Sequence, residues 1–124
     1  MEAIKTNNAP GAIGPYSQGV VVGGLVFVSG QLPMDAATDQ LEEDPGKATN
    51  ISLNNIAAIL AEKGLTMANV VKTTVFLRDM NDFAAMNEEY GKHFSEPYPA
   101  RAAVAAKTLP KNAVLEIEAI AELV

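Results

Sequence analysis

The sequence predicts an α+β fold in which two helices cover one face of a mixed β-sheet. Runs of β-branched and aromatic residues alternate with two segments whose apolar residues recur every three or four positions, which is the helical period. Gly and Pro separate these segments, without a linker, repeat or low-complexity run. With 124 residues, 48% of them hydrophobic, we expect a single domain spanning 1–124, in the order β-β-β-α-β-α-β-β.

The first three strands are expected before residue 33. A short strand is predicted at Glu2–Lys5. Gly23-Gly24 separates Val20–Val22 from Leu25–Val28, which predicts a hairpin because its two-residue turn needs positive φ. The polar segment Pro33–Asp44 is predicted to be a loop.

Both helices show start and stop signals. Asp44 supplies an N-cap carboxylate before Pro45, and Gly64 suits a helix end. Asp79 or Asn81 is expected to cap the second helix. The predicted apolar stripes are Leu53, Ile56, Ile59 and Leu60 in the first helix, and Phe83, Met86, Tyr90 and Phe94 in the second. His93 is placed in the second helix, with a packing or solvent role.

Three further strands complete the predicted sheet: Val70–Leu77, Ala100–Ala106 and the segment from Leu115. The last alternates, with Leu115, Ile117, Ala119, Ala121 and Leu123 on one face and Glu116, Glu118, Ile120 and Glu122 on the other. Because both helices lie on one face, solvent or another subunit must cover the other. The small side chains of Ala100–Ala106 favour an oligomer that packs sheet to sheet.

Composition excludes several kinds of site and partner. Without cysteine there are no disulfides, thiolate nucleophiles, iron–sulfur clusters or cysteine-ligated zinc. The one histidine, His93, excludes a multi-histidine metal site, and a Ser-His-Asp triad would need it as base. Nine basic and fifteen acidic residues, without a basic cluster, argue against a nucleic-acid partner. No stretch approaches the ~20 apolar residues of a membrane helix, and Met1–Lys5 leads straight into polar residues, so we expect a cytoplasmic protein.

Arg101 and the glutamates of the last strand are the first candidate site residues. Arg101 is the only charge in a small, apolar strand, and its planar guanidinium matches a carboxylate ligand. The alternative is an ion pair with Glu116 or Glu118. These two carboxylates, roughly 6.6 Å apart between Cα atoms on one face of a strand, suit general acid and base catalysis. They equally suit the outward face of any half-exposed strand.

Two glycine-containing segments are further candidates. Gly11–Gly19 predicts an irregular backbone with exposed N–H groups, although it matches neither a dinucleotide-binding motif nor a phosphate-binding loop. In Ser29-Gly30-Gln31, the Gly30 N–H is accessible to a carboxylate oxygen. Ser29 has no base near it in the sequence, which argues against a nucleophile.

These segments together resemble the RidA family, also called YjgF or the L-PSP endoribonuclease family. The matching stretches span almost the whole chain in the family's order. They are Ala9–Gly19, Val28–Gln31, Thr73–Leu77, Asp79–Phe83, Tyr98–Arg101, Leu109-Pro110 and Glu116–Ala121.

The resemblance implies a chorismate-mutase-like sandwich that assembles as a homotrimer around a central barrel, with sites in the clefts between subunits. It implies hydrolysis of reactive 2-imino acids, such as 2-iminobutanoate and 2-iminopropanoate, to 2-keto acids and ammonia, without cofactor or metal. The partner is therefore a small 2-imino or 2-keto acid.

Residue roles follow from the same resemblance. Arg101 would bind the carboxylate, with the Gly30 N–H as a second donor, and Glu116 would deprotonate the attacking water. A backbone carbonyl at Ala103 would accept from the imine N–H. The remaining positions expected to line the cleft are Tyr16, Ser29, Asn87 and Pro110.

Two departures and two rival functions accompany this expectation. Many relatives carry cysteine where this chain has Ala103, and the segment Ser95–Tyr98 is shorter than in many of them. One rival is a regulatory trimer that binds a keto acid or amino acid without turnover. The other is an endoribonuclease or translation inhibitor, which the negative charge and the single histidine disfavour.

Overall fold

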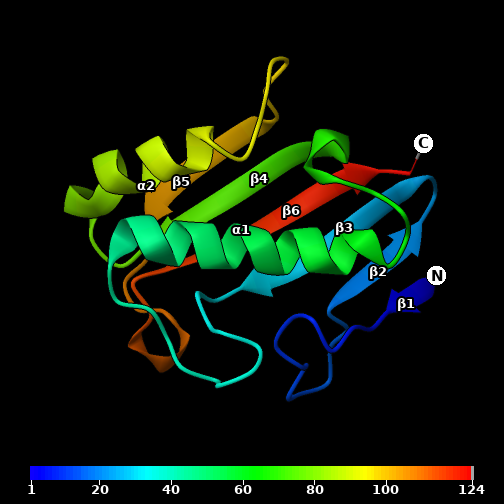
Figure 1. The fold of residues 1–124 in the computed structure, drawn as a ribbon, viewed down its shortest axis with the longest axis horizontal. Coiled ribbons are helices and arrows are strands. Elements are labelled where there is room, and N and C mark those ends of the chain that lie inside the picture. Colours follow the sequence, from blue (N-terminus) through cyan, green and yellow to red (C-terminus); the bar gives the residue numbers. More distant parts are fainter. Residues whose placement is uncertain (124) are drawn as a thin grey trace.

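The computed structural model describes residues 1–123, which form a six-stranded sheet and two α-helices (Figure 1). The helices are α1 (Pro45–Ala61) and α2 (Phe83–Gly91). The strands are β1 (Glu2–Ile4), β2 (Gly19–Val22), β3 (Leu25–Gln31), β4 (Val70–Leu77), β5 (Ala100–Ala105) and β6 (Leu115–Glu122). Short 3-10 turns occupy Met67–Asn69, Met80–Asp82 and Pro110–Asn112. The predicted order of elements is confirmed.

The strand order in the sheet is β1-β2-β3-β6-β4-β5. Only β4 and β5 are parallel among the described pairs, because the chain crosses between them through α2. β6 is inserted between β3 and β4, antiparallel to both. The hairpin prediction is confirmed, since Gly23 and Gly24 have φ of 57° and 78°. β1 and β5 are the two edge strands, and β5 carries Arg101.

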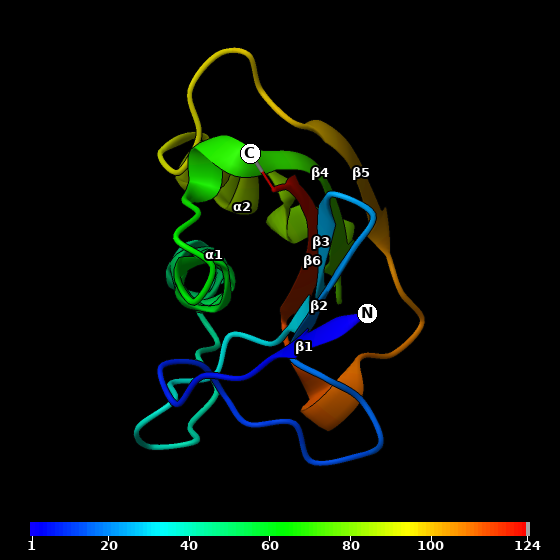
Figure 2. The same cartoon turned by 90° about the vertical axis from the view of Figure 1, so that its right-hand side faces the viewer.

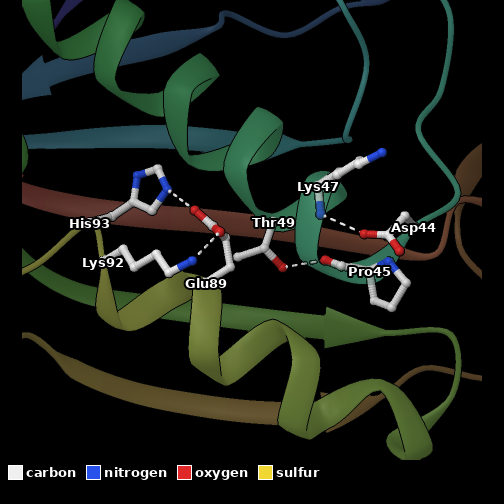
Figure 3. A network of polar contacts seen from close by, with 7 residues as sticks. All are labelled: Asp44, Pro45, Lys47, Thr49, Glu89, Lys92 and His93. Carbon is white, nitrogen blue, oxygen red and sulfur yellow. Dashed lines mark hydrogen bonds and ion pairs between the residues drawn. The ribbon is translucent and has the colours of Figure 1, made fainter.

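The predicted start of α1 is confirmed. The Asp44 side chain accepts a hydrogen bond from the Lys47 N–H at 3.0 Å (Figure 3), and Pro45 occupies the first turn. Gly64 adopts a left-handed φ of 70° just beyond the helix. The apolar stripe predicted for α1 is fully buried against the sheet.

The prediction for α2 is wrong at both ends. Asp79 caps the preceding 3-10 turn through Asn81 N–H, so Asn81 is not the helix cap. The helix ends at Gly91, and Lys92 and His93 N–H groups bond three residues back, which tightens the last turn. His93 and Phe94 therefore lie after the helix. The half-buried His93 ring hydrogen-bonds Glu89 of α2 at 3.1 Å (Figure 3).

Both helices lie on the same face of the sheet, as predicted (Figure 2). The core between the layers includes Val26, Val28, Val75, Leu77, Leu115 and Ile117 from the strands, all buried. The alternation predicts Leu123 on this face, but Leu123 follows the end of β6 and is 41% exposed. Within residues 1–123, no helix is long and apolar enough to span a membrane.

Within the same residues, no helix covers the opposite sheet face, which we call the open face (Figure 2). The strand register places side chains from five strands on it. Its largest apolar members are Val20, Val22, Leu25, Phe27, Phe76, Val104 and Ile120, and its charged members include Lys72, Glu116, Glu118 and Glu122. Phe27 and Val104 are 39% and 47% exposed. An apolar sheet face of this kind is typical of a surface that packs against another subunit.

Candidate functional site

Arg101 lies on the helix-bearing face of the sheet. Its register partner in β4 is Thr73, whose buried hydroxyl contacts Tyr90 of α2, and register partners share a face. The Arg101 Nη1 donates to Asn87 Oδ1 at 2.7 Å, and its Cζ lies 4.8 Å from the Tyr90 ring centroid. Two residues of α2 therefore hold the guanidinium in a defined place.

A pocket opens beside this guanidinium. Its volume is about 490 Å³, and it is lined by Asn87, Tyr90, Gly91, Tyr98, Pro99 and Arg101. The walls combine a cation and an amide with aromatic rings. An anionic group on a small, partly apolar molecule would match this lining. Arg101 also remains solvent-exposed, so an incoming carboxylate can reach it.

Glu116 lies on the opposite, open face. Leu115 and Ile117 on either side of it are buried under the helices, so the alternation of β6 points Glu116 away from them. Burial raises the pKa of the Glu116 carboxyl above its ordinary value, and the nearby charge of Glu118 raises it further. A carboxylate with a raised pKa is a stronger base, which suits proton abstraction near neutral pH.

Gly30 leaves the space that the Glu116 carboxylate occupies. The register between β3 and β6 shifts between Val28 and Gln31, which places a β-bulge at Ser29 and Gly30. A Cβ atom on Gly30 would lie 2.8 Å from Glu116 Oε2 and 2.9 Å from Cδ. Gly30 and the Glu116 carboxylate are therefore direct neighbours on the open face.

Ser29 connects the bulge to the glycine-rich loop. Its Oγ donates to the Ser17 carbonyl at 2.6 Å, and its N–H donates to the Gln18 carbonyl at 2.9 Å. The hydroxyl proton is thus already engaged in a hydrogen bond. Tyr16, next along this loop, is 53% exposed and its ring packs over Gly14.

Buried Gln18 fixes the path of this loop. Its side chain accepts from the Thr6 N–H at 2.7 Å and donates to the carbonyls of Thr6 and Pro10 at 3.0 and 2.8 Å, and to that of Ala9 at 3.4 Å. One amide thereby satisfies several backbone groups of the segment that precedes Tyr16.

Replacing Gln18 by leucine should destabilise the protein by about 2–4 kcal/mol, because buried backbone groups lose their partners. Urea unfolding measures this difference. Gln40→Leu, at an exposed loop position, is the matched control and should change stability by less than about 0.5 kcal/mol. Equal stability of the two variants would contradict the role assigned to Gln18.

The last two predicted residues are Ala103 and Pro110. Ala103 is half-buried on β5 and pairs with Val75. β5 is an edge strand, so alternate residues present backbone groups away from β4. Pro110 is exposed and begins the 3-10 turn that leads into β6.

One chain brings the predicted residues together as two groups on opposite faces of the sheet. Arg101 and Asn87 form the first group, beside α2, and Glu116 and Gly30 form the second, on the open face. The alternative ion pair of Arg101 with Glu116 or Glu118 is not formed within residues 1–123. A site that uses both groups therefore needs a second copy of the chain to approach the first.

Comparison with known proteins identifies the family. The family model described as Endoribonuclease L-PSP matches residues 6–123. The chain belongs to this family. The resemblance to RidA proteins is confirmed. The crystal structure of RidA from an Antarctic Psychrobacter species superposes on this chain with a TM-score of 0.94 and is 45% identical in sequence. The match covers 98% of this chain and 99% of that one.

Another L-PSP relative carries a functional name. The Escherichia coli protein named "Putative reactive intermediate deaminase TdcF" is 47% identical over 121 residues, 95% of this chain and 94% of that protein. The crystal structure of Escherichia coli TdcF with bound serine superposes with a TM-score of 0.92 at 44% identity, over 98% of both chains. At the level of the L-PSP family, these names support a deaminase that handles reactive intermediates.

Three residues that surround Arg101 are not predicted as site residues from the sequence. The patterns place Thr73 in a strand and Phe83 and Tyr90 in an apolar stripe, yet Phe83 and Tyr90 contact the guanidinium and Thr73 holds Tyr90. The spacing of Phe83, Asn87 and Tyr90 places them on one helix face. That signal was available, but nothing in the sequence joins this face to Arg101.

Proposed function

We propose that this protein hydrolyses reactive 2-imino acids, such as 2-iminobutanoate and 2-iminopropanoate, to 2-keto acids and ammonia. The observation that carries the proposal is the Arg101 guanidinium, held by Asn87 at 2.7 Å and open to a pocket of small-molecule size. A 2-imino acid carries a carboxylate next to an electrophilic C=N bond. TdcF, named as a deaminase, has serine in its crystal structure, and serine is also a small molecule with a carboxylate.

The active unit in this proposal is a homotrimer with sites between subunits. The sheet separates Arg101 from Glu116, which supports sites between subunits, because the two side chains of one chain cannot contact the same small molecule. The apolar open face also supports a homotrimer, because a neighbouring subunit would bury the exposed side chains of Phe27 and Val104. Arg101 of one subunit would then face Glu116 of the next.

The residues account for the reaction as follows. Arg101 binds the substrate carboxylate with two N–H donors, which holds the imine carbon at a fixed position. Glu116 takes a proton from water while the water oxygen bonds to that carbon and the C=N π electrons move to nitrogen, which receives the proton. A second proton passes from the new hydroxyl to nitrogen, the C–N bond breaks, and ammonia and the 2-keto acid leave. The reaction needs no cofactor or metal.

The remaining predicted residues have supporting roles in this scheme. The Ala103 carbonyl accepts from the imine N–H, and the Gly30 N–H contributes a further donor to the carboxylate, beside those of Arg101. Tyr16, Ser29 and Pro110 line the cleft. Because the Ala103 contact uses the backbone, alanine in place of the cysteine of many relatives is compatible with activity.

A direct assay tests this function. Threonine dehydratase generates 2-iminobutanoate in place, and the decay of imine absorbance is followed with and without the purified protein. Faster decay in proportion to protein concentration is expected. Tight binding of 2-oxobutanoate without faster decay would instead indicate a binding protein, and cleavage of RNA would support the activity in the family's name.

Gly30→Ala should lower kcat by at least about 10-fold, because the new methyl group displaces the Glu116 carboxylate from its position. The fold should persist, since a flexible side chain can move away from the methyl group. Imine decay and thermal unfolding measure the two effects. Gly11→Ala is the matched control, as a Cβ there meets nothing within 4 Å. Full activity of Gly30→Ala would contradict this placement of the carboxylate.

A further inference from the structure

The Arg101 guanidinium lies over two aromatic rings of α2. Its Cζ is 4.8 Å from the Tyr90 ring centroid and 5.5 Å from the Phe83 centroid. Asn87 Oδ1 takes one of the five guanidinium N–H donors, at 2.7 Å. Because these three residues share one face of α2, the helix sets the position of the guanidinium.

The Tyr90 ring is itself immobilised. Its hydroxyl lies 2.6 Å from Thr73 Oγ1, in a buried hydrogen bond, and its ring packs on Phe94 at a centroid distance of 4.7 Å. Tyr90 and Thr73 are 6% and 1% exposed. The ring cannot turn away without leaving a buried hydroxyl unpaired, which is costly.

These contacts connect Arg101, Thr73 and Tyr90 in a closed cycle. Thr73 is the register partner of Arg101 across β4 and β5, Thr73 bonds to Tyr90, and Tyr90 supports the guanidinium. Strand pairing links Arg101 to Thr73, and Tyr90 contacts both of their side chains. A free arginine side chain loses much rotamer freedom when it binds a ligand, and a guanidinium that is held beforehand loses less.

We infer that Tyr90 is a positioning residue: its ring, fixed by Thr73, holds the Arg101 guanidinium in the orientation that receives the substrate carboxylate. The role of the carboxylate rests on the proposed function, whereas the ordering of Arg101 by Tyr90 does not. Because the ring acts on ligand capture and not on the attack of water, its loss raises Kd and KM and leaves kcat nearly unchanged.

Three variants test the inference by calorimetric titration with 2-oxobutanoate and by imine-decay kinetics. Tyr90→Leu should raise Kd and KM about 5- to 30-fold, with kcat changed less than about 3-fold. Tyr90→Phe keeps the ring but loses the hydrogen bond to Thr73, and should recover part of the affinity. Ile59→Val trims a fully buried side chain that packs on β2, far from β5 in the sheet, and should bind as the unmodified protein does, despite lower stability.

Nuclear magnetic resonance of the arginine Nε–Hε groups gives a readout that needs no ligand. The Arg101 signal should show restricted motion in the unmodified protein and in Ile59→Val, and become mobile in Tyr90→Leu. An ordered Arg101 in Tyr90→Leu, or a loss confined to kcat, would overturn the inference. If the unmodified protein neither binds 2-oxobutanoate nor hydrolyses imine, the proposed function fails, while the Arg101 signal still decides the role of Tyr90.

Discussion

Replacing Arg101 by alanine is expected to lower kcat/KM for 2-iminobutanoate by about 10²- to 10⁴-fold, the effect of losing two charge-assisted hydrogen bonds to the carboxylate. The variant should stay folded, because the side chain is exposed and its partner Asn87 can turn to water. Imine decay, with circular dichroism and sedimentation as checks on fold and assembly, measures this outcome.

Arg101→Lys is the matched control for this prediction. Lysine keeps the positive charge but lacks the planar fork, so it should recover only part of the lost activity. Ala100→Gly, at a neighbouring exposed position of β5, should leave turnover near that of the unmodified protein. Turnover by Arg101→Ala equal to that of the unmodified protein would end the proposal that this guanidinium binds substrate.

Glu116→Gln should reduce kcat by about 10²- to 10⁴-fold, because glutamine cannot accept the proton from water. The raised pKa of Glu116 sets the pH dependence: activity should fall as the pH drops through that pKa, at a higher pH than for an ordinary carboxyl. Glu118→Gln removes a charge that raises this pKa, so it should move the acid limb to lower pH while activity persists. A pH profile of kcat/KM measures both effects.

The stability of Glu116→Gln should change in the opposite sense from its activity. A raised pKa means that the folded state favours the protonated carboxyl, so its contribution to stability is present at low pH and lost as the pH rises through the folded-state pKa. Glutamine stays neutral, and the variant should be at least as stable as the unmodified protein at neutral pH. Activity that is retained, or a marked loss of stability there, would contradict the assignment.

Mixing the two inactive variants tests whether sites form between subunits. Arg101→Ala retains Glu116, and Glu116→Gln retains Arg101. In randomly mixed trimers, every mixed trimer has one intact site, so refolding the variants together should restore about a quarter of the unmodified activity. Mixtures that stay inactive after demonstrated subunit exchange would show that each site lies within one chain.

Much of the fold could be predicted because its signals are local. Gly23-Gly24 sets the hairpin turn, Asp44-Pro45 starts α1, and strict alternation defines β6 through Glu122. The prediction for α2 was wrong at its ends because its start is formed by a 3-10 turn and its last turn tightens before His93. Helix ends of this kind depend on which backbone groups find partners, and single residue preferences do not determine that.

For the candidate site, the sequence alone determined the residue types and the family: a lone arginine among alanines, alternating glutamates, and glycines at the loop and the bulge. Only the tertiary structure placed Arg101 on the helix side, Glu116 and Gly30 in contact on the open face, and Tyr90 under the guanidinium. The physical reason is that alternation along a strand assigns residues to faces, but the partner across a sheet or a helix is set by packing between segments far apart in the chain.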